Sequence, residues 1–224
     1  MPDPTTNFAT ARRMMVDGQL RTYDITDQDL LSAMLELPRE KFIPAAMSGI
    51  AYLDTDVSVG PGGRRMLKPM VLAKLIQAAG IMTADHVLDV GCATGYSSAV
   101  LAKLAASVVA LEADNSLADT ARRNLSEVGA ASASVVTGPL AEGCPSRGPY
   151  DVIVLNGAVE TVPPQLLKQL KEGGRLVAVV GSGPASKATL YRSAGVGGEV
   201  SARTIFDASG ALLPGFSKPA EFVF

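Results

Sequence analysis

The 224-residue sequence predicts an α/β fold in which helices flank a mostly parallel sheet, with an antiparallel hairpin at the C-terminal end and a helical extension at the N-terminal end. Three observations support this prediction. Residues 86–100, HVLDVGCATGYSSAV, indicate a buried strand, a tight glycine turn and the start of a helix. Strand-like and helix-like segments alternate over residues 69–180, as parallel pairing requires. Two further strand-like segments flank the glycine-rich residues 195–198, which is a hairpin signal.

The composition argues against several classes of protein. The formal charge of −2 and the absence of tryptophan give no basic footprint and few stacking side chains, so we expect no nucleic-acid partner. The sequence contains no run of about eighteen apolar residues, which a membrane span would require. The N-terminus has no apolar signal core, so we expect a cytoplasmic protein. One histidine and two cysteines favour neither a metal site nor a disulfide framework. Cys92 and Cys144 either line one pocket or pack as small core residues.

The N-terminal part of the chain is expected to be helical. Residues 1–7 carry two prolines and are expected to be disordered. Apolar spacing predicts a helix over residues 8–20, and Asp27 can cap a second helix that ends at Pro38. Residues 37–56 have no clear periodicity, because their prolines break them into short pieces.

The elements of the expected sheet domain follow from local signals. Proline in the first turn and Gly80 after the last turn bound a helix at Pro69–Ala79. The helix after the glycine turn continues to Ala105, and Asn115 can cap the next helix, which Gly129 ends. The other expected elements are strands at 86–90, 108–111, 134–137, 151–155 and 175–180, a helix at 163–170, and a terminal hairpin of residues 188–194 and 199–208.

These elements suggest how the chain is divided. Residues 1–68 are expected to pack as an extension on a ligand-binding domain formed by residues 69–224. Residues 60–63 are the only candidate linker, because they combine three glycines with a proline. Residues 214–224 are expected to run extended over an edge of the sheet.

The turn after the first strand predicts a ligand site. Backbone N–H groups at a helix N-terminus face a ligand, and glycine lets the ligand approach the main chain. Glu112 ends the next apolar run about twenty residues later, at the spacing where a carboxylate meets a ribose diol. A dinucleotide fingerprint that starts at Gly91 would require glycine where Ala93 and Tyr96 stand, which disfavours a nicotinamide cofactor. The alternative is an α/β fold with tight turns and no ligand.

Residues 89–95 instead form the pattern D-x-G-x-A-x-G, which resembles the first motif of the S-adenosyl-L-methionine (SAM)-dependent methyltransferases, with alanine in place of the middle glycine. Residues 37–56, LPREKFIPAAMSGIAYLDTD, resemble the stretch V-P-R-E-x-F-V-P leading to A-Y-x-D of the protein-L-isoaspartate O-methyltransferases. The residues that match this stretch are Pro38, Arg39, Glu40, Phe42, Pro44, Ala51, Tyr52 and Asp54. The resemblance covers about residues 12–181 and implies a Rossmann-like methyltransferase fold with SAM as cofactor.

The resemblance also implies an activity, the methyl esterification of isoaspartyl α-carboxylates in damaged protein, and hence a protein or peptide substrate. By the same resemblance Asp89 lies near the methionine end of the cofactor, the turn Gly91–Gly95 wraps around it, and Glu112 holds the ribose. A carboxylate acceptor is already ionised at neutral pH, so the reaction needs no general base. The full set of implied cofactor contacts is Asp89, Gly91, Cys92, Ala93, Gly95, Tyr96, Glu112, Ala113, Pro139, Leu140 and Asn156.

The loop that holds the acceptor in this family differs here. The family pattern G-x-G-x-T-I-S-Q-P becomes G-P-G-G-R-R-M-L-K-P over residues 60–69. Leu67 stands where the family has the serine beside the acceptor, and leucine offers no hydrogen bond, so no catalytic residue is assigned. Arg64, Arg65 and Lys68 bring three cations into the loop. They either hold an acidic acceptor by charge or form a solvated basic loop.

Four further positions bear on the cofactor side. Ala93 adds a methyl group that crowds the cofactor if its φ is positive. The family's G-D-G, whose acid meets the adenine amino group, corresponds to residues 138–140, so Pro139 stands at the acid; Pro139 and Leu140 can still pack on the adenine face. Asn156 follows the fourth strand of the sheet and either lines the ligand-binding edge or forms an ordinary turn.

Two other functions are compatible with these departures. One is a methyltransferase with a different acceptor, because the serine is missing at Leu67. The other is a binding or regulatory protein that keeps the fold and transfers nothing.

Overall fold

The computed structural model describes residues 7–60, 62–194 and 199–217. Most of the segment for which disorder is expected, and the expected hairpin turn at 195–198, lie outside these residues. Asn7 is described, and its side chain accepts a hydrogen bond from the Thr10 N–H at 3.1 Å. Disorder is therefore the wrong prediction for Asn7, because this bond caps the first helix.

The sheet has the order β5-β4-β3-β6-β7-β8-β9. Its first five members in this order pair in parallel, and β8 and β9 are antiparallel. The predicted mostly parallel sheet with a C-terminal antiparallel hairpin is therefore confirmed. The strands are β3 (His86–Val90), β4 (Ser107–Glu112), β5 (Ala133–Thr137), β6 (Tyr150–Val159), β7 (Leu170–Val180), β8 (Lys187–Ser193) and β9 (Val200–Asp207).

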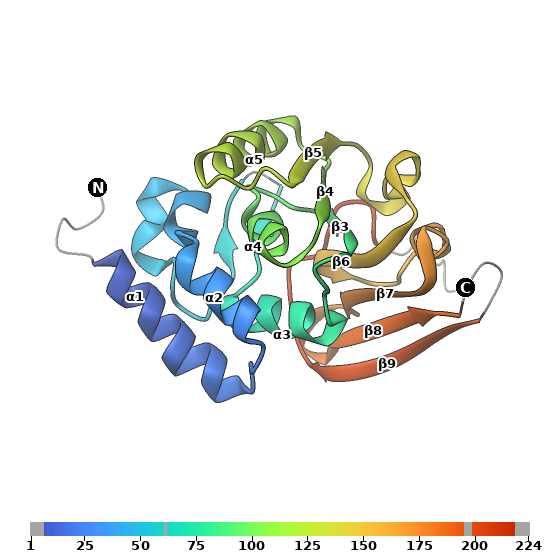
Figure 1. The fold of residues 1–224 in the computed structure, drawn as a ribbon, viewed down its shortest axis with the longest axis horizontal. Coiled ribbons are helices and arrows are strands. Elements are labelled where there is room, and N and C mark those ends of the chain that lie inside the picture. Colours follow the sequence, from blue (N-terminus) through green and yellow to red (C-terminus); the bar gives the residue numbers. More distant parts are fainter. Residues whose placement is uncertain (1–6, 61, 195–198, 218–224) are drawn as a thin grey trace, which may run out of the picture.

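Helices cover the sheet, and an N-terminal extension packs beside them (Figure 1). The α-helices are α1 (Phe8–Met15), α2 (Gln28–Glu36), α3 (Pro69–Ala79), α4 (Tyr96–Leu104), α5 (Asn115–Glu127) and α6 (Pro164–Leu167). A π-helical turn at Val16–Leu20 prolongs α1, so that the predicted helix over residues 8–20 is present. Short 3₁₀ turns lie at Arg21–Tyr23, Arg39–Phe42, Ala45–Ile50, Leu140–Glu142, Pro145–Arg147 and Gly183–Ala185. A separate two-stranded hairpin consists of β1 (Val57–Ser58) and β2 (Arg65–Met66).

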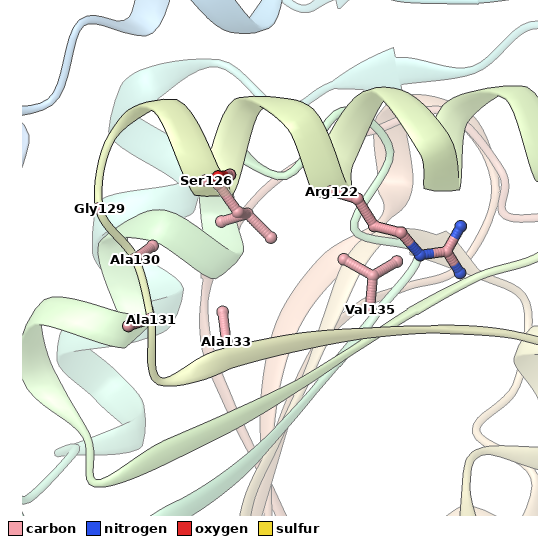
Figure 2. Close-up of a pocket in the computed structure, with 8 residues that line it drawn as sticks. Arg122, Ser126, Gly129, Ala130, Ala131, Ala133 and Val135 are labelled. Carbon is pink, nitrogen blue, oxygen red and sulfur yellow. The ribbon is translucent and has the colours of Figure 1, made fainter.

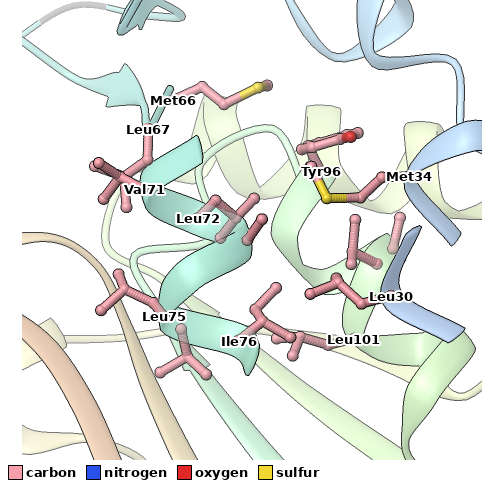
Figure 3. Packing of buried hydrophobic residues seen from close by; sticks show 14 of the residues in the cluster. Leu30, Met34, Met66, Leu67, Val71, Leu72, Leu75, Ile76, Tyr96 and Leu101 are labelled. Atoms are coloured by element: carbon pink, nitrogen blue, oxygen red, sulfur yellow. The ribbon is translucent and has the colours of Figure 1, made fainter. Parts of the chain in front are cut away.

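The central strands are mostly apolar because both faces of the sheet are covered. Along β3, Val87 belongs to one hydrophobic cluster, whereas Leu88 and Val90 belong to another. Successive side chains of a strand point to opposite faces, so this division follows the pleat. The larger cluster joins the extension to the sheet domain, with Leu30 of α2 and Leu101 of α4 in the same packed layer (Figure 3).

A buried ion pair closes the end of α3. The Arg175 Nε in β7 donates to the Ala79 carbonyl at 2.8 Å, and a terminal nitrogen donates to the Gly80 carbonyl at 2.6 Å. That terminal nitrogen also lies 2.6 Å from an oxygen of Asp85, and both side chains are buried. Arg175 therefore satisfies carbonyl groups that every helix leaves unpaired at its C-terminus.

The region between β6 and β7 differs from the prediction. A helix at 163–170 and a strand that starts at Arg175 are expected, but α6 ends at Leu167 and β7 starts at Leu170. The Tyr150 N–H donates to the Gln169 carbonyl at 2.8 Å, so this segment pairs with the start of β6 instead of continuing the helix. The two glycines at 173 and 174 lie where the register between β6 and β7 shifts.

The C-terminal segment pairs in parallel with the carboxyl end of β6, where Leu212 lies opposite Ala158. The Ala158 N–H donates to the Ala211 carbonyl, and the Leu213 N–H donates to the Ala158 carbonyl, both at 2.8 Å. The expected edge-covering segment at 214–224 is described only as far as Ser217. Pro214 and Gly215 form a turn, and the Phe216 carbonyl accepts a hydrogen bond from the Glu160 N–H at 3.3 Å. Of the helices described, none combines the length and apolarity needed to cross a bilayer.

The N-cap of α5 is Asp114, not the predicted Asn115. The Asp114 side chain accepts a hydrogen bond from the Leu117 N–H at 2.9 Å, and Asn115 is the first helical residue. We expect Asp114→Ala to lower the free energy of unfolding by about 1 kcal/mol, because a cap is lost. Asn115→Ala is the matched control and should change it by less than about 0.5 kcal/mol. Urea denaturation of both variants measures this, and equal losses would contradict the assignment of the cap.

Candidate functional site

The turn between β3 and α4 has the left-handed backbone that its glycines permit. Gly91 has φ 78°, Gly95 has φ 96°, and Ala93 between them has φ 51°. The N–H groups of Gly91 and Cys92 both donate to the Leu111 carbonyl, at 2.8 and 3.1 Å, which ties the turn to β4. A non-glycine residue at positive φ is strained, so Ala93 adopts this conformation at a cost of about 1–2 kcal/mol.

Asp89 lies beneath this turn and is fully buried. Its Oδ2 accepts hydrogen bonds from the hydroxyls of Ser97 and Ser98 in α4, both at 2.6 Å. Its Oδ1 is buried with no hydrogen-bond partner among the described residues. Burial raises the pKa of Asp89 to about 6, although the two hydroxyl donors lower it in part.

Glu112 at the end of β4 is also fully buried, and both of its oxygens are engaged. Its Oε1 accepts from the N–H groups of Ala113 and Asp114, at 2.9 and 3.2 Å. Its Oε2 accepts from the Ala93 N–H at 2.7 Å and from a terminal nitrogen of Arg64 at 2.6 Å. The carboxylate predicted to hold a ribose is therefore paired with an arginine of the same chain.

For Arg64, the prediction of a solvated basic loop is wrong. Its side chain is 6% exposed, and the nitrogen that reaches Glu112 also donates to the Gly91 carbonyl at 3.2 Å. Arg65 and Lys68 differ from it. Arg65 is exposed and donates to the Asp56 carbonyl at 3.3 Å, and Lys68 lies 3.7 Å from a carboxylate oxygen of Asp54.

Leu213 of the C-terminal segment covers the same turn. A Cβ at Gly91 would lie 2.8 Å from a methyl group of Leu213 and 3.4 Å from the Arg64 terminal nitrogen. A Cβ at Gly157 would lie 2.7 Å from Leu213. The glycines of the turn are predicted to let a ligand approach the backbone closely. In the structure, Leu213 and Arg64 make this close approach.

A cavity of about 370 Å³ remains next to the ion pair. Among the predicted site residues, Glu112 and Ala113 face it. The residues that line it are Gly62, Arg64, Glu112, Ala113, Asp114 and Pro214. Pro139 is exposed. Leu140 is buried in the hydrophobic cluster that contains Leu88 and Val90 of β3.

Asn156 extends the polar groups beneath the turn. It is buried where the register of β6 shifts, and its Nδ2 donates to the Ser97 hydroxyl at 2.5 Å. Its Oδ1 has no hydrogen-bond partner in the described part of the chain. Asp89, Ser97 and Asn156 thus form a buried chain of polar side chains behind the glycine turn.

The remaining predicted contacts, Cys92 and Tyr96, are buried core residues. Tyr96 packs under the Arg39 guanidinium, whose carbon lies 4.8 Å from the ring centre. Burial raises the pKa of the Cys92 thiol well above its ordinary value, which disfavours the reactive thiolate. Cys92 and Cys144 belong to different hydrophobic clusters, so they pack as small residues and do not share a pocket.

Leu67 contributes to the core instead of an acceptor site. Its side chain is 1% exposed and packs in the cluster of α3 and α4 (Figure 3). A Cβ at Gly210 would lie 3.0 Å from a Leu67 methyl group. The Leu67 carbonyl accepts a hydrogen bond from a buried nitrogen of Arg39 at 2.8 Å.

A second cavity, of about 330 Å³, lies between α5 and the edge strand β5, where the chain bends at Gly129 (Figure 2). Its lining includes three alanines, Leu125 and Val135, and it contains none of the predicted site residues that the structure describes. Arg122 at its rim pairs with Asp119 at 2.6 Å. Within residues 7–60, 62–194 and 199–217, no three histidine, cysteine or carboxylate side chains are grouped to hold a metal ion.

Comparison with known proteins identifies the family. A family model described as Protein-L-isoaspartate(D-aspartate) O-methyltransferase (PCMT) matches residues 11–205. The chain belongs to the protein-L-isoaspartate O-methyltransferase family. It is therefore a class I SAM-dependent methyltransferase, as the resemblance of its two motifs predicts.

Individual relatives agree with this assignment. The chain is 43% identical to a protein-L-isoaspartate O-methyltransferase of Koribacter versatilis over 177 residues, which are 79% of each chain. It is 39% identical to one of Methanoculleus marisnigri over 170 residues, which are 76% of this chain and 77% of the relative.

Solved structures share the fold. A protein-L-isoaspartate O-methyltransferase superposes with a TM-score of 0.78 and 25% identity, covering 91% of this chain and 66% of that one. A Plasmodium falciparum structure assigned to the same family, in complex with S-adenosyl-L-homocysteine, superposes with a TM-score of 0.76 over 90% of this chain and 97% of that one. Its 19% identity supports the fold alone. The predicted Rossmann-like methyltransferase fold is confirmed.

Several residues of the site are not among those predicted from the sequence. Ser97 could have been found, because a serine pair in the first turn of a helix lies within reach of an acid near the end of the preceding strand. Leu213 and the pairing of Arg64 carry no local signal. Arg64 and Glu112 are 48 residues apart, and contact at that separation depends on the fold.

The shifted pKa of Asp89 predicts a pH effect. Between about pH 4 and pH 6 the folded protein keeps Asp89 protonated, whereas the unfolded chain has lost that proton. This contribution to the free energy of unfolding therefore falls as pH rises through this window, by an amount on the order of 3 kcal/mol. In Asp89→Asn the same fall should be absent. Urea denaturation across the window measures it, and equal pH slopes in both proteins would contradict the burial of an ionisable group.

The burial of Leu67 predicts the effect of restoring the family's serine. Leu67→Ser should lower the free energy of unfolding by roughly 2–5 kcal/mol, because it leaves a cavity in the core. Leu67→Met, which conserves volume, is the control and should cost less than about 1.5 kcal/mol. Thermal and urea denaturation measure both. A serine variant as stable as the wild type would show that the Leu67 side chain does not support the core.

Proposed function

We propose that this chain transfers the methyl group of SAM to the free α-carboxylate of an isoaspartyl residue in a protein or peptide. The observation that supports this most directly is the buried Glu112 at the end of β4, beside the glycine turn, in a chain whose family match spans residues 11–205. The same proposal assigns cofactor binding to the residues at the carboxyl end of β3 and β4.

The residues present fit the cofactor. Glu112 lies at the sequence spacing from the glycine turn that is typical of a carboxylate that meets a ribose diol, and it lines the adjoining cavity together with Ala113. The buried Oδ1 atoms of Asp89 and Asn156 are acceptors that have no protein partner among the described residues. A ligand with ammonium or hydroxyl donors could satisfy them, and the methionine and ribose parts of SAM carry both.

The chemistry requires alignment more than proton transfer. When bound, SAM supplies an electrophilic methyl group on its sulfonium. Glu112 and the turn around Gly91 would hold the nucleoside, and the segment at Leu213 would exclude water from the reacting groups. The acceptor carboxylate is ionised at neutral pH, so the missing general base is consistent with this reaction.

A second candidate is methyl transfer to a different carboxylate acceptor. Leu67 favours it, since its side chain is buried in the core where the family has a polar contact to the acceptor. Lys68 follows Leu67 directly and is partly exposed, so it is the cation of the loop that this candidate assigns to an acidic acceptor.

Transfer of labelled methyl groups from SAM tests the proposal. We expect the wild-type protein to label a peptide that contains isoaspartate and not the peptide of identical sequence that contains aspartate. S-adenosyl-L-homocysteine should inhibit the labelling, and NAD, as the control ligand, should not. Labelling of neither peptide, in a protein that binds S-adenosyl-L-homocysteine, would contradict the isoaspartyl acceptor and favour the second candidate.

A further inference from the structure

We propose that Arg64 is an internal competitor for the cofactor site, a guanidinium that must leave Glu112 before a nucleoside diol can bind there. The inference rests on the proposed cofactor site and adds a residue that regulates its occupancy. In the structure described here, Arg64 bonds the carboxylate oxygen that a ligand hydroxyl would need.

The division of donors on Glu112 shows why the two would compete. Oε1 is held by the N–H groups of Ala113 and Asp114, which follow it directly in the chain. Oε2 receives the Ala93 N–H at 2.7 Å and Arg64 at 2.6 Å. Arg64 is thus the only side-chain donor on Glu112 in the described chain. It occupies the position that a ligand hydroxyl would take.

The surroundings of Arg64 suit a group that can leave. Its Nε is buried and has no partner among the residues described, so the closed arrangement leaves a polar group unsatisfied. Gly62 and Gly63 precede it at φ 66° and 75°, and a Cβ at either position would meet no atom within 4 Å. The cavity of about 370 Å³ next to the guanidinium gives the side chain room to move.

The backbone of the loop keeps Arg64 close to the site even when the side chain moves. The Val59 N–H donates to the Arg64 carbonyl at 3.0 Å, next to the β1–β2 pair. Gly60 in the same loop lies against α5, where its Cβ would be 2.9 Å from a Leu117 methyl group. The loop is therefore anchored on both sides, and the guanidinium can leave Glu112 by movement of the Arg64 side chain alone.

Competition of this kind lowers apparent affinity by the fraction of molecules that are open. A hydrogen bond between charged groups corresponds to a factor of roughly ten to a hundred. We expect Arg64→Met to bind S-adenosyl-L-homocysteine roughly ten- to hundredfold more tightly than the wild type, because the closed state is removed while Glu112 keeps its backbone donors. Isothermal titration calorimetry with S-adenosyl-L-homocysteine measures this without requiring activity.

Matched variants separate competition from a structural role. Arg122→Met removes an arginine that pairs with Asp119 at the same 2.6 Å outside the site, and it should leave affinity unchanged. Glu112→Gln is made in the Arg64→Met background, where it should weaken binding, because the ribose contact is lost and no competitor remains. If the ion pair served stability alone, Arg64→Met would not tighten binding. Thermal melts of each protein without ligand establish that it is folded.

The outcomes distinguish this inference from the proposed function. Tighter binding by Arg64→Met, with Arg122→Met unchanged, supports the inference. Equal or weaker binding by Arg64→Met overturns it and leaves the cofactor site in place. Absence of binding in every folded variant overturns the cofactor site itself, and the inference with it. If Arg64→Met does not fold, Arg64→Gln, which keeps a polar side chain but loses the charge that pairs with Glu112, must bind more tightly than the wild type.

Discussion

The burial of the Glu112 carboxylate is the constraint on which the site depends. A charge removed from water is tolerated only when it is paired and hydrogen-bonded. Here its partners come from three segments: the glycine turn through Ala93, the start of α5 through Ala113 and Asp114, and the loop before α3 through Arg64. One side chain therefore fixes the relative positions of the turn, the helix and the loop.

The same hydrogen bond explains how Ala93 is accommodated where the family has glycine. The positive φ of Ala93 directs its N–H to the Glu112 Oε2 at 2.7 Å. A hydrogen bond to a charged acceptor contributes about 1.5–3 kcal/mol, which is comparable to the cost of placing alanine in the left-handed region. Alanine at position 93, in place of the family's glycine, is thus compatible with the left-handed conformation of the turn.

Local signals in the sequence predict the elements around the site because short-range physics determines them. The apolar run of β3, the glycines of the turn, and the proline and glycine that bound α3 each act within a few residues. The same signals place Glu112 at the end of β4. They fail where two neighbouring residues compete, as with Asp114 and Asn115, since both can cap a helix.

They also fail where distant segments meet. The helix predicted at 163–170 is shortened because its last residues pair with β6, and Arg64 is buried because it meets Glu112 across the fold. Leu67 is a related case. Sequence comparison shows which polar group is missing there, but only packing shows that the leucine belongs to the core.

The buried Arg175 has a consequence for the order in which the chain can fold during synthesis. Its partners on α3, the carbonyls of Ala79 and Gly80, lie 96 and 95 residues earlier in the chain. Until β7 has left the ribosome, these carbonyls have no arginine to bond, and Asp85 has no cation beside it. Contacts between such distant residues form late, because the loop between them must close first. The packing of α3 can therefore be completed only after the second half of the protein has been synthesised.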